Sequence, residues 1–167
     1  SSRKDMGGGV ILDAIHEIDY AAWMLGRAKT VACMADKVSS LELDVEDAAD
    51  IIIRYSSGVI GHIHLDYLQR AYSRRCKFIG EDGVIKWDFT EKRTGLYLAR
   101  DKKWTWFEEP ADYDINLMYV DEMTHFVSCL NGQDSPTLDI VGGYEDLKIV
   151  LAAKRSADEK RFINLTA

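Results

Sequence analysis

The chain has 167 residues, of which 21 are Lys or Arg and 28 are Asp or Glu, giving a formal net charge of −7. Its length suits one folded domain with a single core, and 47% hydrophobic residues with two prolines exclude a disordered, low-complexity chain. The acidic balance disfavours nucleic-acid binding, and we expect neither a membrane span nor a signal peptide. Three widely separated cysteines predict reduced thiols in a cytoplasmic protein.

The first predicted element is a helix over residues 10–25. Its apolar positions repeat at steps of four and three residues, which is the spacing of one helical face, and Gly26 is expected to end it. The pattern then changes to the alternation of strands, with turns at Ser57-Gly58 and Asp82-Gly83. We expect one meander of six or seven antiparallel strands, within residues 31–35, 48–55, 59–68, 74–79, 84–89, 96–99 and 104–107.

Helical periodicity returns after Pro110. One helix is predicted over residues 119–130 and closed by Gly132, and another begins near Asp139, followed by a short strand at 162–165. The inner face of the later helix should carry Tyr144, Leu147, Val150 and Leu151. Because the strands are grouped between helices, the order predicts an α+β fold: a largely antiparallel open sheet with helices packed on one face.

Residues 7–20 hold the pattern that points to chemistry. On the predicted helix, Asp13, His16, Glu17 and Tyr20 lie on the face opposite the apolar stripe. A histidine beside carboxylates is a common proton donor or acceptor near neutral pH, and the glycines at 7–9 allow a ligand to approach the backbone. The alternative is a solvated polar face behind a flexible glycine entry, and the pattern alone leaves both interpretations open.

The string GGGVILDAIHEIDYAAWMLG resembles the opening of the C-terminal domain of the Gfo/Idh/MocA oxidoreductases. The resemblance extends over nearly the whole chain through weaker matches that occur in the same order: Val45-Glu46-Asp47, Ser57-Gly58, residues 80–85, residues 122–126, Asn131-Gly132 and Ser135-Pro136.

The resemblance implies a fold like the C-terminal domain of dihydrodipicolinate reductase, which supplies the substrate site and the oligomer interface of a two-domain enzyme. In this family, an N-terminal Rossmann domain binds NAD or NADP. The sequence has no G-x-G-x-x-G motif after a strand, so residues 1–167 are interpreted as the substrate-binding and oligomerisation domain without its Rossmann domain.

The implied function is hydride transfer between nicotinamide and a sugar, a nucleotide sugar or a polyol, with the isolated chain inactive. By resemblance, His16 contacts the reacting hydroxyl or carbonyl with Asp13 as its catalytic partner, and a lysine of the missing domain is the main acid or base. Asp19, Glu17 and Tyr20 are the implied substrate-binding residues. The alternative is a stand-alone ligand-binding or dimerisation module without catalysis.

One departure from the family concerns the spacing of the two catalytic candidates. The family commonly has Asp-x-x-x-His, whereas Asp13-Ala14-Ile15-His16 is one residue shorter. On a regular helix, this difference turns the Asp13 side chain by about 100° around the axis. The shorter spacing therefore makes His16 the firmer of the two assignments.

A second polar group lies in the predicted strands. His62, His64 and Asp66 alternate on one strand face, where they either hold a metal ion or lie on a sheet surface that family members bury in dimers. No second ligand-bearing segment accompanies them, so no metal is predicted. We expect a homo-oligomer, dimer or tetramer, through the open sheet face, with a small sugar or polyol as substrate.

Aromatic residues gather in the later strands, with Trp87, Trp104 and Trp106 among them. They favour packing in a core or against another subunit, with stacking on sugar rings as the alternative.

Overall fold

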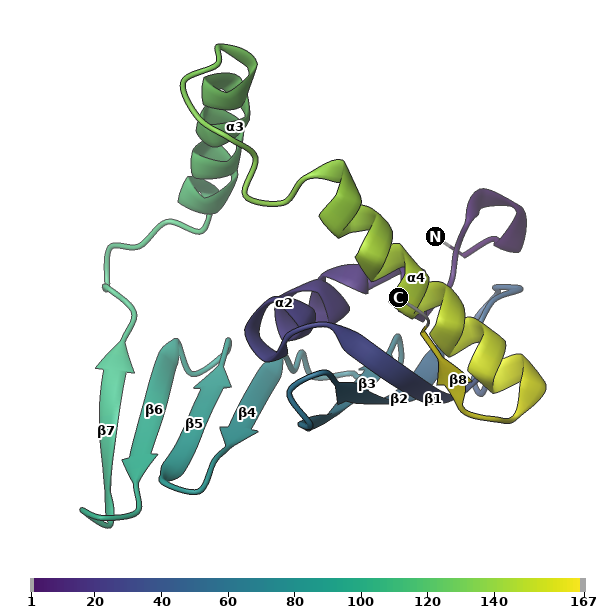
Figure 1. Cartoon of the computed structure of the whole chain (residues 1–167), viewed down its shortest axis with the longest axis horizontal. Helices are drawn as coiled ribbons and strands as arrows, with labels where there is room; N and C mark the ends of the chain where they lie inside the picture. Colours follow the sequence, from purple (N-terminus) through teal and green to yellow (C-terminus); the bar gives the residue numbers. More distant parts are fainter. Residues whose placement is uncertain (1, 166–167) are drawn as a thin grey trace. The chain divides into compact units, whose positions relative to one another are not determined.

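The computed structural model describes residues 2–165, and the chain divides into two compact units. Unit 1 contains the residues up to Leu68 and those from Thr137 onward, and unit 2 is Gln69–Pro136. Each unit contains one four-stranded antiparallel sheet (Figure 1). The predicted α+β class is confirmed, although the strands divide between two sheets where the sequence suggested one meander.

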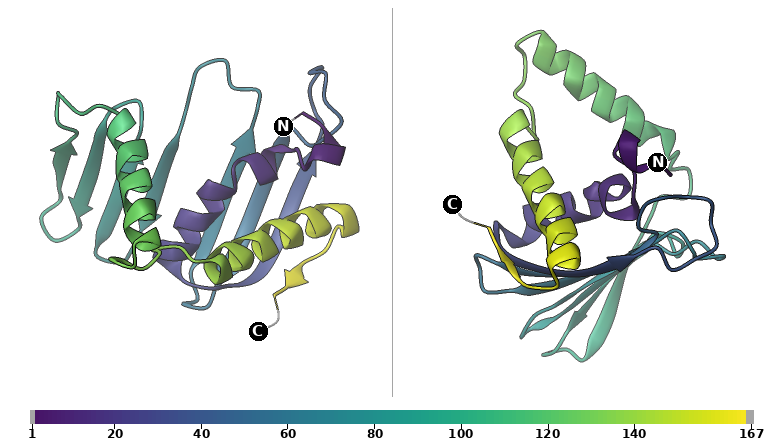
Figure 2. Two further views of the ribbon diagram at one scale, coloured as in Figure 1. Left: turned by 90° about the horizontal axis from the view of Figure 1, so that it is seen from above. Right: turned by 90° about the vertical axis from the view of Figure 1, so that its right-hand side faces the viewer.

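The sheet of unit 1 has the strand order β3-β2-β1-β8. Its strands are β1 (Ala28–Asp36), β2 (Ala48–Tyr55), β3 (Ile60–Asp66) and β8 (Ile163–Asn164). Its helical elements are η1 (Lys4–Met6), α1 (Val10–Asp13), α2 (Ile15–Leu25) and α4 (Ile140–Glu159). Helices α2 and α4 lie over the same face of the sheet (Figure 2), as expected for helices packed on one side of an open sheet.

The core of unit 1 lies between that sheet face and the helices. Strand β2 alternates between buried and exposed positions, so Ile51 and Ile53 point to the helices while Asp50 and Ile52 point away. Removal of this apolar surface from water is the main stabilising contribution. The fully buried aliphatic residues come from helices and strands alike: Ile11, Ile18, Val31, Ile51, Ile53 and Val150.

The inner face of α4 differs from the sequence prediction. Val150 is buried as expected, but the other three predicted residues are exposed: Tyr144, Leu147 and Leu151. The residues that pack inward with Val150 are Asp146, Ile149, Ala152, Ala153 and Ser156. The polar Ser156 can be buried because its hydroxyl group is hydrogen-bonded there. Ser156 Oγ accepts a bond from the Cys33 N–H at 2.9 Å and donates one to the Arg161 carbonyl at 2.7 Å.

Unit 2 contains the second sheet, in the order β4-β5-β6-β7, and one helix. These elements are β4 (Arg75–Ile79), β5 (Gly83–Asp88), β6 (Arg93–Leu98), β7 (Lys103–Glu108) and α3 (Asn116–Leu130). Gly95 is the one buried residue in this unit, all of which the structure describes. A Cβ on Gly95 would lie 2.7 Å from the Trp106 ring and 2.9 Å from the Trp104 ring, so these two indoles cover the glycine.

The apolar side chains of α3 are exposed rather than packed. None of its residues is buried, and Met123, Phe126 and Leu130 are among the large side chains it leaves in solvent. Within residues 2–165, no helix is long and apolar enough to span a membrane.

Candidate functional site

The predicted helix at 10–25 is interrupted at the centre of the chemistry-bearing pattern. Helix α1 ends at Asp13 and α2 begins at Ile15, with Ala14 between them at φ −103° and ψ 28°. The sequence prediction of one continuous helix is therefore wrong at this point. Asp13 and His16 lie on two different helical segments, so their relative direction is not set by a regular helical turn.

The start of α1 is fixed to the segment that precedes β2. The Val10 N–H donates to the Glu46 carbonyl at 3.1 Å, and Gly9 takes a positive φ of 117°. The positive φ disfavours any other residue, and a Cβ on Gly9 would lie 2.3 Å from Glu46 Oε1, so the Glu46 carboxylate would have to move. Lys154 Nζ of α4 donates to both Glu46 carboxylate oxygens at 2.7 and 2.8 Å. The chain at Gly9 is therefore closely packed against Glu46, and it is not a flexible segment before α1.

Asp13 is exposed and accepts a hydrogen bond from a residue that the sequence analysis did not single out. The Tyr67 hydroxyl, just past the end of β3, donates to Asp13 Oδ2 at 2.5 Å. Burial and the Asp13 carboxylate raise the pKa of Tyr67, so its phenol stays protonated as a donor. No local motif marks this pair, because 54 residues separate its members.

His16 also projects into solvent. Its side chain is 56% exposed, and Nε2 lies 3.2 Å from Oε1 of Glu17, whose side chain is only 14% exposed. Glu17 can therefore hold the imidazole in one orientation while the ring remains accessible to a ligand. This arrangement agrees with a proton-transferring histidine beside a carboxylate.

The structure turns Asp19 toward α4. Its carboxyl hydrogen-bonds to Asp146, which is buried. Burial, together with the negative charge of Asp19, raises the pKa of Asp146 to about 6, because two close carboxylates disfavour double ionisation. Asp19 therefore lies in a helix-helix contact. Tyr20, the last predicted substrate-binding residue, is half-buried.

The polar group on β3 lies on the sheet face opposite the helices. Asp50 Oδ1 of β2 contacts His62 Nε2 at 3.0 Å and His64 Nδ1 at 2.9 Å, and His64 Nε2 contacts Asp66 Oδ2 at 3.1 Å. The hydrogen bond that the Asp50 carboxylate accepts from the His64 ring raises the pKa of His64 and lowers that of Asp50. Among the residues that the structure describes, no group of three His, Cys, Asp or Glu side chains is placed to hold a metal ion. The metal interpretation of this cluster is therefore not supported.

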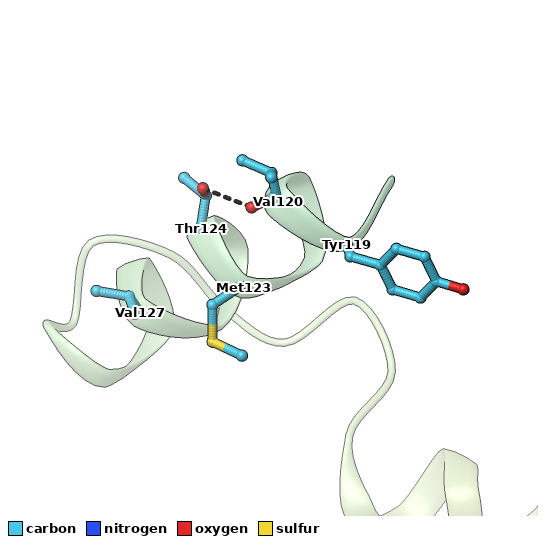
Figure 3. Close-up of a pocket in the computed structure, with 5 residues that line it drawn as sticks. All are labelled: Tyr119, Val120, Met123, Thr124 and Val127. Atoms are coloured by element: carbon cyan, nitrogen blue, oxygen red, sulfur yellow. Dashed lines mark hydrogen bonds between the residues drawn. The ribbon is translucent and has the colours of Figure 1, made fainter. Parts of the chain in front are cut away.

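Two surface hollows lie away from Asp13 and His16. One, of about 470 Å³, is lined by a single face of α3, and Figure 3 shows that its side chains all come from this one helix: Tyr119, Val120, Met123, Thr124 and Val127. The other, of about 400 Å³, lies in unit 1 beside Gly26, Asp146 and Ile149. Neither includes Asp13 or His16, whose site on this chain is an open surface.

Comparison with known proteins defines the class to which this chain belongs. Residues 1–86, more than half of the chain, match the model of the GFO/IDH/MocA C-terminal domain. The chain therefore belongs to the Gfo/Idh/MocA family of oxidoreductases, as its opening motif predicts.

The chain is similar to particular members at low identity. Myo-inositol 2-dehydrogenase of Thermotoga maritima is 26% identical over 96% of this chain and 50% of that enzyme. The fold is similar to that of GenD2 from gentamicin A biosynthesis, solved with NAD (TM-score 0.81, 21% identity, 99% of this chain and 51% of that one). It is also similar to levoglucosan dehydrogenase with NADH and levoglucosan (TM-score 0.83, 18% identity, 96% and 51%). The chain thus spans about half the length of these proteins.

Proposed function

We propose that this chain is the substrate-binding and oligomerisation domain of an NAD- or NADP-dependent oxidoreductase that acts on a sugar, a nucleotide sugar or a polyol. The observation that carries the proposal is the exposed His16 in contact with Glu17 on α2, three residues after Asp13, which ends the helix whose start the Gly9–Glu46 junction fixes. Family membership supports this interpretation, as do relatives whose names describe dehydrogenases of such compounds.

The cofactor is proposed to bind mainly to a domain outside this sequence. All strand pairs among the described residues are antiparallel, so they include no parallel β-α-β unit of the kind that binds a dinucleotide. The residues of this chain therefore do not fit the cofactor's main site by themselves. For this reason we expect the chain alone to show no turnover.

The residues of this chain would act on the hydroxyl of the substrate. His16 would hold or transfer the proton of the oxygen at the reacting carbon, while the Asp13 carboxylate would accept a hydrogen bond from the same or a neighbouring hydroxyl. Glu17 orients the imidazole through its contact with Nε2. Nicotinamide, when bound, supplies the hydride chemistry.

The test uses the full-length protein and a panel of sugars and polyols, with reduced nicotinamide followed by absorbance. His16→Ala should lower kcat/KM by about a hundredfold or more, the usual contribution of a positioned acid or base. His125→Ala in α3, where His125 contacts Asp134, is the matched control and should retain activity. Unchanged kcat/KM in His16→Ala would remove His16 from the catalytic role, and no turnover of any compound in the panel by the full-length protein would favour the non-catalytic binding module.

The oligomer is proposed to form through the uncovered face of the unit 1 sheet. That face exposes apolar side chains that no element of unit 1 covers, with Met34 at 81%, Ile60 at 57% and Ile52 at 48% exposure. The Asp50–His62–His64 cluster lies on the same face. Ile52→Lys should convert the oligomer to monomers in light scattering, whereas Ile79→Lys in unit 2 should not.

A further inference from the structure

The shorter spacing between Asp13 and His16 requires something other than the helix to direct Asp13. Asp13 is the last residue of a four-residue helix, and the irregular Ala14 separates it from the helix that carries His16. A carboxylate at such a position has several accessible rotamers unless another group holds it. The structure supplies that group from a distant part of the chain.

Tyr67 is suited to this task because its own backbone is fixed on both sides. The Tyr67 N–H donates to the Asp47 carbonyl at 2.9 Å, and the next N–H, of Leu68, donates to Asp66 Oδ1 at 2.7 Å. Asp47 is fully buried, and its carboxylate accepts bonds from Val38 N–H at 2.7 Å and from Ser39. The phenol at the end of this chain of contacts is therefore anchored to the sheet rather than to a mobile loop.

The contact between Tyr67 and Asp13 has the features of a strong, directional bond. Its acceptor is a carboxylate, and charge-assisted bonds of this kind are shorter and stronger than neutral ones. The Tyr67 hydroxyl oxygen and Asp13 Oδ2 are 2.5 Å apart, and the bond between them connects the end of β3 to the end of α1. Because the phenol keeps its proton at neutral pH, it can only donate to the carboxylate.

We propose that Tyr67 is a positioning residue that directs the Asp13 carboxylate toward the substrate surface beside His16, and so compensates for the shortened Asp13–His16 spacing. This inference rests on the proposed oxidoreductase function. The proposed substrate class is unchanged and consists of polyhydroxylated compounds. Asp13 would bind the hydroxyl group next to the reacting carbon.

The experiment is a double-mutant cycle in the full-length protein. Tyr67→Phe should lower kcat/KM about tenfold, as expected for loss of one hydrogen bond to a charged group. In an Asp13→Ala background, Tyr67→Phe should cause no further loss, because the hydroxyl then has no carboxylate to direct. A purely structural role of the phenol would not give this non-additivity.

Tyr55→Phe is the matched control. Tyr55 lies in the same unit, and its buried hydroxyl has no hydrogen-bond partner among the described residues. Removing that hydroxyl should leave kcat/KM unchanged.

Three outcomes would overturn the inference. The first is a wild-type kcat/KM in Tyr67→Phe while His16→Ala and Asp13→Ala lose activity, which would leave the proposed function intact. The second is an equal loss in both backgrounds. The third is a fall in the unfolding temperature of Tyr67→Phe larger than that of Asp13→Ala, which would assign Tyr67 to stability. If His16→Ala and Asp13→Ala also kept full activity, the proposed function itself would fail.

Discussion

The two units of this chain have similar secondary structure but very different interiors. Both have a four-stranded antiparallel sheet with helical segments, yet unit 1 buries aliphatic side chains from three helices and four strands, whereas unit 2 buries only Gly95. Since apolar burial is the main source of folding free energy, unit 1 has the means to hold its own structure. The apolar side chains of unit 2 resemble those of a surface that is completed by contact with another protein surface.

The sharpest test of this difference compares an isoleucine of a central strand in unit 1 with an isoleucine at the end of an edge strand in unit 2. Ile53→Ala in β2 removes a fully buried side chain and should lower the free energy of unfolding by about 2–5 kcal/mol. Ile79→Ala in β4, where the side chain is 73% exposed, should cost less than about 1 kcal/mol. Denaturant unfolding of both variants measures the difference. Equal losses would mean that unit 2 has a core comparable to that of unit 1.

The pH dependence of stability should arise in unit 1. The folded-state pKa of Asp146, about 6, lies above its ordinary value of 3.8, so the folded state binds the proton more tightly. The resulting stability is complete below about pH 4 and is lost as the pH rises through about 6. Asp146→Asn should remove this dependence and raise the stability at pH 7 by about 1–2 kcal/mol. Denaturant titrations at pH 4.5 and 7 measure it, and an unchanged slope with pH in the variant would contradict the assignment.

A pair of glycine substitutions probes packing in each unit. Gly95→Ala should destabilise unit 2 by about 1–3 kcal/mol, because the new methyl group would collide with the Trp104 and Trp106 rings. The methyl group added by Gly143→Ala in α4 would have no atom within 4 Å in its way. This substitution should stabilise unit 1 by about 0.5–1 kcal/mol, because alanine has the higher helix propensity. Thermal unfolding followed by fluorescence and by circular dichroism reports both. If Gly95→Ala were neutral, the two indoles would have to move aside freely.

The smallest expected effect concerns the buried hydroxyl of Tyr55. Burial raises the pKa of this phenol to about 12, and the oxygen finds no partner among the described residues. Tyr55→Phe should therefore be neutral or stabilise unit 1 by up to about 1 kcal/mol, since it removes an unsatisfied polar group. A clear loss of stability in denaturant unfolding would show that the hydroxyl has a partner, such as a water molecule.

Local patterns predicted the elements well where the chain itself buries them. The β-type run at 48–55, rich in isoleucine and ended by the Ser56-Ser57-Gly58 turn, placed β2 correctly. The same reasoning predicted strands in unit 2, but it could not reveal that their apolar side chains stay exposed. An apolar pattern predicts that a surface will be buried, but it does not tell whether the same chain or another protein buries it.

The features of the site that the sequence did not reveal depend on contacts between distant residues. Asp13 and His16 were found from a local motif, whereas Tyr67 donates from a position 54 residues further along the chain and no spacing rule points to it. Likewise, Ser156 is buried because Cys33 and Arg161 satisfy its hydroxyl, and Asp19 turns toward α4 because Asp146 lies there. Such placements are decided by tertiary hydrogen bonds and not by periodicity.

The stacked indoles over Gly95 give the two units separate optical signatures. The chain has four tryptophans; Trp87, Trp104 and Trp106 lie in unit 2, while Trp23 of unit 1 is 80% exposed. The rings of Trp104 and Trp106 are 5.3 Å apart and nearly parallel, and Arg93 lies 4.1 Å from the Trp106 ring. Tryptophan emission therefore reports chiefly on the sheet of unit 2. A shift of that emission to shorter wavelength would show that a partner covers this sheet. Far-ultraviolet circular dichroism, in contrast, follows the backbone of both units.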